Sequence, residues 1–141
     1  MLSQQEIVKD YAQCLKDQKD AYFIGRRLDY FSVVEGALKL KEVSYVHADA
    51  YIAGELKHGP IALIDKGTVV IALATQEEVA SKTISNIEET IARGANVILI
   101  TTQHQDTHAF QKVLRIPDVH RLWQLYQPLS FYSFLPIMER C

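Results

Sequence analysis

The sequence Thr68-Val-Val-Ile-Ala-Leu-Ala74 decides the fold, because it is an apolar run without polar alternation. Such a run is typical of a parallel-sheet strand that is covered on both faces. The next predicted strand is Asn96-Val-Ile-Leu-Ile-Thr-Thr102. The residues between them, 77–93, place four apolar side chains on one helical stripe: Ala80, Ile84, Ile87 and Ile91. Gly94 suits the end of that helix. The order strand–helix–strand predicts a βαβ unit.

The same alternation extends on both sides of this unit. The remaining predicted elements are an amphipathic helix over 1–18, a strand over 21–25, a helix over 29–45 that Asp29 could cap, a strand over 112–117 and a helix over 119–134. Strands that alternate with helices indicate an α/β fold, here a doubly wound parallel sheet of about five strands flanked by helices. We therefore expect a leading helix over residues 1–20 and one domain over residues 21–141.

The bulk composition excludes several classes of partner. The 141 residues carry a net charge of −2, and no basic cluster points to nucleic acid or to a membrane surface. No apolar run approaches the ~20 residues of a membrane span, and the N-terminus lacks the features of a secretory signal. The two cysteines, Cys14 and Cys141, form no disulfide framework and no metal-binding spacing. We expect free thiols and a cytoplasmic protein.

Three charged residues share one face of the predicted 29–45 helix. Glu35, Lys39 and Glu42 follow the spacing i, i+4, i+7, which makes each a neighbour of the next. The other, broader side of the helix is apolar and consists of Val33, Val34, Ala37, Leu38 and Leu40. A solvated surface with two weak ion pairs explains this pattern. Alternatively, a lysine between two carboxylates could lie over a cleft, where its charge and desolvation would tune one carboxylate as a general base. Spacing alone leaves both interpretations open.

A second candidate is His58 in the segment Gly54-Glu-Leu-Lys-His-Gly-Pro60. The flanking glycines and the proline predict a loop or a short turn. His58 could simply be solvated there. It could also shuttle protons, because an unperturbed imidazole has a pKa of about 6.5.

Three other histidines, His47, His104 and His108, are weaker candidates. His47 is expected to be a hydrogen-bonded structural residue. His104 and His108 lie four residues apart, near Asp106, but in a polar segment that argues against a metal site. Neither a dinucleotide fingerprint nor a P-loop occurs. We expect no metal and no cofactor.

Two stretches together resemble a known family. They are Glu35-Gly-Ala-Leu-Lys-Leu-Lys-Glu42, followed by residues 44–48, and Gly54–Pro60, followed by residues 61–65. In order and spacing they are similar to the second SIS (sugar isomerase) domain of the glucosamine-6-phosphate synthase family. The match runs without gaps from about residue 23 to residue 65, and more loosely to about residue 132. The resemblance implies the SIS fold.

The resemblance also implies an activity and a role for each candidate residue. The family converts fructose 6-phosphate and glutamine-derived ammonia to glucosamine 6-phosphate without pyridoxal phosphate or metal. Glu42 would move the proton between C1 and C2, and Lys39 would be its proton-handling neighbour. Glu35 would orient the site, and His58 would assist ring opening, reaching the active site of a partner subunit. A homodimer is therefore expected.

The chain departs from the family pattern in several places. The glutaminase domain, the first SIS domain and the tail with its Schiff-base lysine are not found in it. Because the first SIS domain supplies most phosphate contacts, no substrate-binding residue is assigned here. Residues 131–141 do not match the family's C-terminus, and Arg27 replaces a glycine of the family. We expect a fragment that is inactive alone.

Two alternatives remain open. One is a deglycase or ketose-amine isomerase that acts on sugar-amine phosphates with the same fold and base. The other is a sensor module that binds a sugar phosphate without catalysis. Retention of both Glu42 and His58 favours an enzyme over a sensor.

Overall fold

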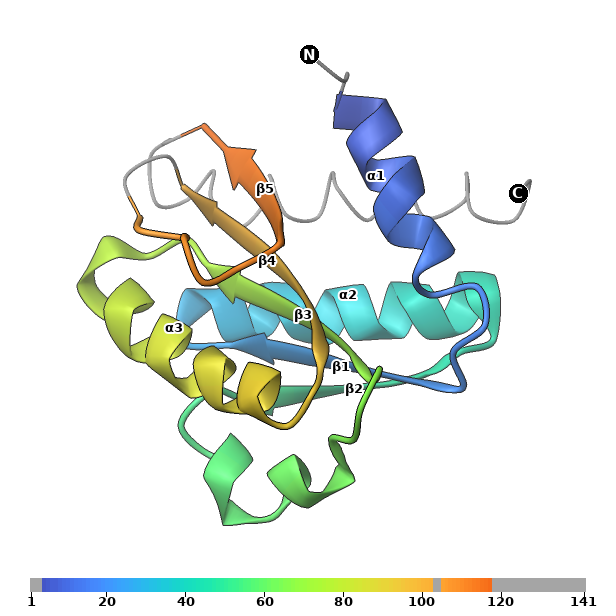
Figure 1. Ribbon diagram of the computed structural model, residues 1–141, viewed down its shortest axis with the longest axis horizontal. Coiled ribbons are helices and arrows are strands. Elements are labelled where there is room, and N and C mark those ends of the chain that lie inside the picture. The colour runs from blue at the N-terminus through green and yellow to red at the C-terminus, as the bar shows by residue number, and fades with distance from the viewer. Residues whose placement is uncertain (1–3, 103–104, 118–141) are drawn as a thin grey trace.

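The protein is built around one five-stranded parallel sheet. The structure, a computed structural model, describes residues 4–102 and 105–117. The strands are β1 (Asp20–Gly25), β2 (His47–Ile52), β3 (Val69–Ala74), β4 (Asn96–Thr102) and β5 (Lys112–Ile116), in the order β2-β1-β3-β4-β5 (Figure 1). The helices are α1 (Gln4–Gln13), α2 (Leu28–Ser44) and α3 (Glu77–Ala92), with 3-10 turns η1 (Leu56–His58) and η2 (Pro60–Leu63). The predicted α/β fold with a parallel sheet is confirmed.

Helices cover the two faces of the sheet separately. Alternate residues of β1 point to opposite sides: Ala21 and Phe23 pack in the core under α2, whereas Tyr22 and Ile24 pack in the core under α3. The segment that follows α1 lies on the α2 side of the sheet, where Leu15 packs in the core. All six residues of β3 are buried, as its unbroken apolar sequence predicts.

The topology fixes which side each connection takes. Parallel crossovers are right-handed in nearly all proteins. The crossover β1–α2–β2 moves toward one edge of the sheet, whereas β2–η1–η2–β3 and β3–α3–β4 move toward the other. The 3-10 turns therefore lie on the α3 side, opposite α2, and Leu56 of η1 packs in the α3-side core.

Strand β2 was not predicted. Its sequence His-Ala-Asp-Ala-Tyr-Ile is mixed, and among its residues only Ala48 is buried. It lies at the edge of the sheet and pairs with β1 alone among the described strands. Edge strands need no continuous apolar sequence. The helix predicted over residues 119–134 lies outside the described residues, and α1 ends earlier than predicted, at Gln13.

The predicted cap of α2 by Asp29 is wrong. Arg27 occupies the capping position, with φ 54°, and makes no side-chain cap. Asp29 lies inside the first turn, where its carboxylate accepts hydrogen bonds from the N–H (2.9 Å) and the hydroxyl (2.5 Å) of Thr75. At the end of α3, Gly94 has φ 89° and donates its N–H to Ile91, as predicted. No helix within the described part of the chain has the length and apolar character to cross a bilayer.

Candidate functional site

Helix α2 brings the three predicted charged residues together. Lys39 Nζ lies 3.0 Å from Glu42 Oε2 and 3.8 Å from Glu35 Oε1. The hydrogen bond and negative charge of Glu42 raise the pKa of Lys39, with a smaller contribution from Glu35. Each of the three side chains is about half exposed, between 43% and 52%. Helix α2 thus holds a charged ammonium group against a carboxylate that is accessible to solvent.

An exposed apolar stripe runs beside these charges along α2. Val33, Ala37 and Leu40 are buried as predicted. Val34 and Leu38 belong to the same predicted apolar side of the helix, but the structure exposes them, at 42% and 44%. The stripe consists of Phe31, Val34, Leu38 and Tyr45. Phe31, Val34 and Leu38 are three or four residues apart on one face of α2, and Tyr45 directly follows the helix. Clustered exposed apolar side chains are typical of a surface that contacts another protein.

A cavity of about 780 Å³ opens at the C-terminal end of the same helix. The end of α1, the segment after it and the end of α2 line it: Lys9, Ala12, Gln13, Leu15, Lys16, Asp17, Val43, Ser44, Tyr45 and Val46. Val43 is the neighbour of Glu42 in the chain, but the charged triplet itself does not line this cavity. This cavity is therefore not the cleft predicted over Glu35, Lys39 and Glu42. A cleft at these three residues would need a second protein surface that faces α2.

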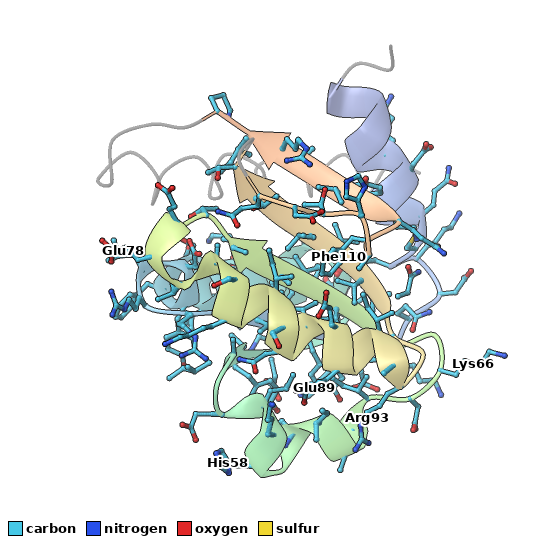
Figure 2. All side chains as sticks on the ribbon, turned by 60° about the vertical axis from the view of Figure 1, so that its left-hand side comes forward. His58, Lys66, Glu78, Glu89, Arg93 and Phe110 are labelled. Carbon is cyan, nitrogen blue, oxygen red and sulfur yellow. The ribbon has the colours of Figure 1, made fainter. Side chains whose placement is uncertain are left out.

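His58 lies at the end of η1, on the other side of the sheet. Leu56, which is 1% exposed, anchors the turn in the core, and Lys57 forms an ion pair with Glu89 of α3. Gly59 follows with φ 148°, a conformation suited to glycine. The His58 side chain is exposed, and Figure 2 shows it pointing away from the sheet. The loop or short turn predicted here is confirmed.

The structure separates the two parts of the predicted site. Glu42 lies on the helix that covers one face of the sheet, whereas His58 lies on the turn that covers the other face. One copy of the described chain therefore cannot present both groups to a single small substrate.

A buried polar cluster at the C-terminal end of β3 was not predicted. Besides its two bonds to Thr75, Asp29 is hydrogen-bonded by Gln76, whose side-chain amide also donates to the carbonyl of Arg26 at 3.0 Å. Burial raises the pKa of Asp29, although the hydrogen bonds from Thr75 and Gln76 act in the opposite direction. In the sequence, the feature that could have indicated this cluster is the polar pair Thr75-Gln76 directly after the apolar strand. This cluster positions α2 and so the charged triplet.

His47 and His108 each have a carboxylate neighbour. His47 Nδ1 lies 3.1 Å from Asp20 Oδ1, which fits the predicted structural role. His108 Nε2 lies 3.8 Å from Asp106 Oδ1, and His104 lies outside the described residues. Over residues 4–102 and 105–117, the structure contains no group of three or more His, Cys, Asp and Glu side chains that could hold a metal ion.

Comparison with known families gives a match over most of the chain. The sequence profile of the SIS domain matches residues 14–125. The chain is 46% identical to glutamine–fructose-6-phosphate aminotransferase [isomerizing] of Clostridium tetani over 144 aligned positions, and 50% identical to the protein of that name from Symbiobacterium thermophilum over 123. The alignments cover 99% and 86% of this chain, but only 24% and 20% of the relatives. The chain thus spans about a quarter of the length of these proteins.

A solved structure agrees with the sequence comparison. The C-terminal domain of glucosamine-fructose-6-phosphate aminotransferase from Francisella tularensis superimposes with a TM-score of 0.81 at 35% identity. The superposition covers 96% of this chain and 38% of that domain. The similarity therefore extends over nearly the whole chain in both sequence and three-dimensional structure.

Proposed function

The chain belongs to the SIS domain family, and from this premise we propose that it supplies the proton-transfer residues of a sugar-phosphate isomerase site. The site would belong to a glutamine–fructose-6-phosphate aminotransferase that acts in the cytoplasm. Its substrates would be fructose 6-phosphate and glutamine-derived ammonia, and its product glucosamine 6-phosphate. The 44–50% identity to sequence relatives of that name supports this assignment over a deglycase or a sensor.

The geometry of Glu42 and Lys39 carries the proposal. Isomerisation of an open-chain sugar requires one base to remove a proton from one carbon and return it to the adjacent carbon. Glu42 is reachable from solvent, and the ammonium group of Lys39 lies 3.0 Å from its Oε2. Lys39 would stabilise negative charge on the substrate oxygen as the enediol forms. Glu35 would hold Lys39 from its other side.

His58 would act in a site formed by two copies of the chain. It would exchange protons with the ring oxygen and the anomeric hydroxyl during ring opening. The placement of Glu42 and His58 on opposite sides of the sheet supports a homodimer in which each site takes one residue from each subunit. The apolar stripe of Phe31, Val34, Leu38 and Tyr45 supports the contact of α2 with further protein surface.

Replacement of the corresponding segment of the Clostridium tetani relative by this chain would test the proposal. We expect the chimera to form glucosamine 6-phosphate, and Glu42→Gln to reduce kcat by about 10²–10⁴-fold, the usual contribution of a positioned base. Glu88→Gln, on the exposed face of α3, is the matched control and should leave kcat unchanged. The 141-residue chain alone should form no measurable product. A chimera whose activity survives Glu42→Gln would refute the assigned base.

A further inference from the structure

A thiol and an amine from distant parts of the chain meet at the N-terminal edge of the sheet. Lys112 begins β5, and its Nζ lies 2.7 Å from Sγ of Cys14, which follows α1. The same Nζ donates a hydrogen bond to Oδ1 of Asn96, the first residue of β4, at 2.9 Å. The Lys112 amine thus contacts both the sulfur of Cys14 and the side-chain oxygen of Asn96.

The surrounding structure keeps this pair together. The Tyr11 hydroxyl donates to the carbonyl of Val113, the neighbour of Lys112, at 3.3 Å. The N–H of Cys14 donates to the carbonyl of Tyr11 at 3.1 Å, which fixes the turn that presents the sulfur. Cys14 and Lys112 are both partly buried, so a small oxidant can reach them while their mobility is restricted. Cys14 is a free cysteine.

We propose that Cys14 and Lys112 form a covalent sulfur–nitrogen cross-link when a peroxide oxidises the thiol. A sulfenic acid formed on cysteine condenses with a nearby nucleophile, either a thiol or a nitrogen. The nucleophile that contacts the sulfur of Cys14 is the amine of Lys112. Holding two reacting groups in contact raises their effective concentration by orders of magnitude.

The reaction balances in two steps. First, the sulfur attacks one oxygen of hydrogen peroxide, the O–O bond breaks, and the other oxygen leaves with the thiol proton as water. The sulfur is oxidised by two electrons to a sulfenic acid, and the peroxide is reduced. Second, the neutral amine of Lys112 attacks the sulfur. The S–N bond forms, the S–O bond breaks, and the hydroxide leaves as water with one amine proton. The chain has then lost two hydrogen atoms.

The link would fasten α1 to the sheet. Lys9, Ala12 and Gln13 of α1 line the cavity beside the end of α2, so the cross-link would fix one wall of that cavity. Because the linked residues lie far apart in the sequence, it would also restrict the unfolded chain, as a long-range disulfide does. The oxidised protein should therefore unfold at a higher temperature than the reduced protein, and a dithiol reductant should abolish the difference.

Mass spectrometry of the Cys141→Ser variant, in which Cys14 is the sole thiol, tests the proposal. After peroxide treatment, we expect a tryptic product that joins residues 10–16 to residues 94–115, uncut at Lys112 and lighter than the sum of the two peptides by two hydrogen atoms. Dithiothreitol should return both peptides.

Lys112→Arg is the matched control. It keeps a cation and its donors, but the guanidinium stays protonated and does not attack sulfur. In this variant a dimedone adduct should accumulate at Cys14, with no cross-linked peptide and no rise in Tm on oxidation. Oxidation of Cys141→Ser that gives only sulfinic or sulfonic acid at Cys14 would overturn the proposal. A joined peptide that retains an oxygen between sulfur and nitrogen would overturn the direct bond.

Discussion

The carboxylate of Asp29, in the first turn of α2, accepts hydrogen bonds from both the backbone N–H and the hydroxyl of Thr75, at the end of β3. Asp29 is 4% exposed and Thr75 is 2% exposed. Two residues that are 46 positions apart thus tie the start of α2 to the central part of the sheet. Since α2 carries Glu35, Lys39 and Glu42, this contact fixes the direction in which the charged triplet points.

Asp29→Ala should lower the free energy of unfolding by about 2–3 kcal/mol, because it leaves the buried N–H and hydroxyl of Thr75 without an acceptor. Urea denaturation measures the change. Asp17→Ala, at an exposed aspartate outside this cluster, is the control and should change the stability by less than about 0.5 kcal/mol. Equal losses in the two variants would show that the Asp29–Thr75 contact contributes little.

Asp29 should also make stability depend on pH. Burial raises its pKa in the folded state, so the folded protein binds this proton more tightly than the unfolded chain does. Its contribution is complete below the ordinary pKa of an aspartate and is lost as pH rises through the raised value. Relative to Asp29→Asn, whose amide can still pair with Thr75, the parent chain should lose stability over that range. A constant difference between the two from acid to neutral pH would contradict this expectation.

Gly25→Ala should be strongly destabilising. A Cβ at this position would lie 2.7 Å from the backbone carbon of Asp29 and 2.9 Å from the nitrogen of Tyr30. Backbone atoms cannot move aside as side chains do, so we expect a loss of about 3 kcal/mol or more. At Gly54, a new Cβ would meet only the flexible guanidinium of Arg26, at 3.0 Å. In thermal unfolding, the Tm of Gly54→Ala should therefore be well above the Tm of Gly25→Ala.

Mixed subunits can test the proposed shared site. In the chimera, Glu42→Gln and His58→Asn should each inactivate the homodimer. A heterodimer of the two variants should regain activity, because one of its two sites receives an intact Glu42 from one subunit and an intact His58 from the other. Purified heterodimers should have about half the specific activity of the parent. Heterodimers as inactive as the single variants would assign both residues of each site to one subunit.

The sequence predicted the interior of this fold well, because β3 is buried over its whole length and β4 is buried from Val97 to Thr102, and both contain a continuous apolar run. The periodicity of α2 likewise predicted the clustering of Glu35, Lys39 and Glu42, since residues three and four apart on a helix must meet. These features depend only on local geometry.

Other features depend on contacts that a sequence does not display. Strand β2 escaped prediction because an edge position permits a polar, alternating sequence. The role of Asp29 was misassigned because a capping residue and a buried acceptor look alike until Thr75 is brought beside it. Val34 and Leu38 belong to the predicted apolar side of α2, although the structure exposes them. Apolar character alone does not distinguish a core residue from one on a contact surface.

The strand order also bears on how the chain folds during synthesis. β1 leaves the ribosome first of the five strands, yet it ends between β2 and β3. Its second neighbour, β3, is synthesised more than forty residues later, so the edge of β1 that pairs with β3 stays unpaired until residue 74 has emerged. Parallel pairing over such separations is slow. The growing chain therefore has an interval in which this open edge of β1 is available to aggregation or to chaperones, and that interval closes only when β3 pairs with β1.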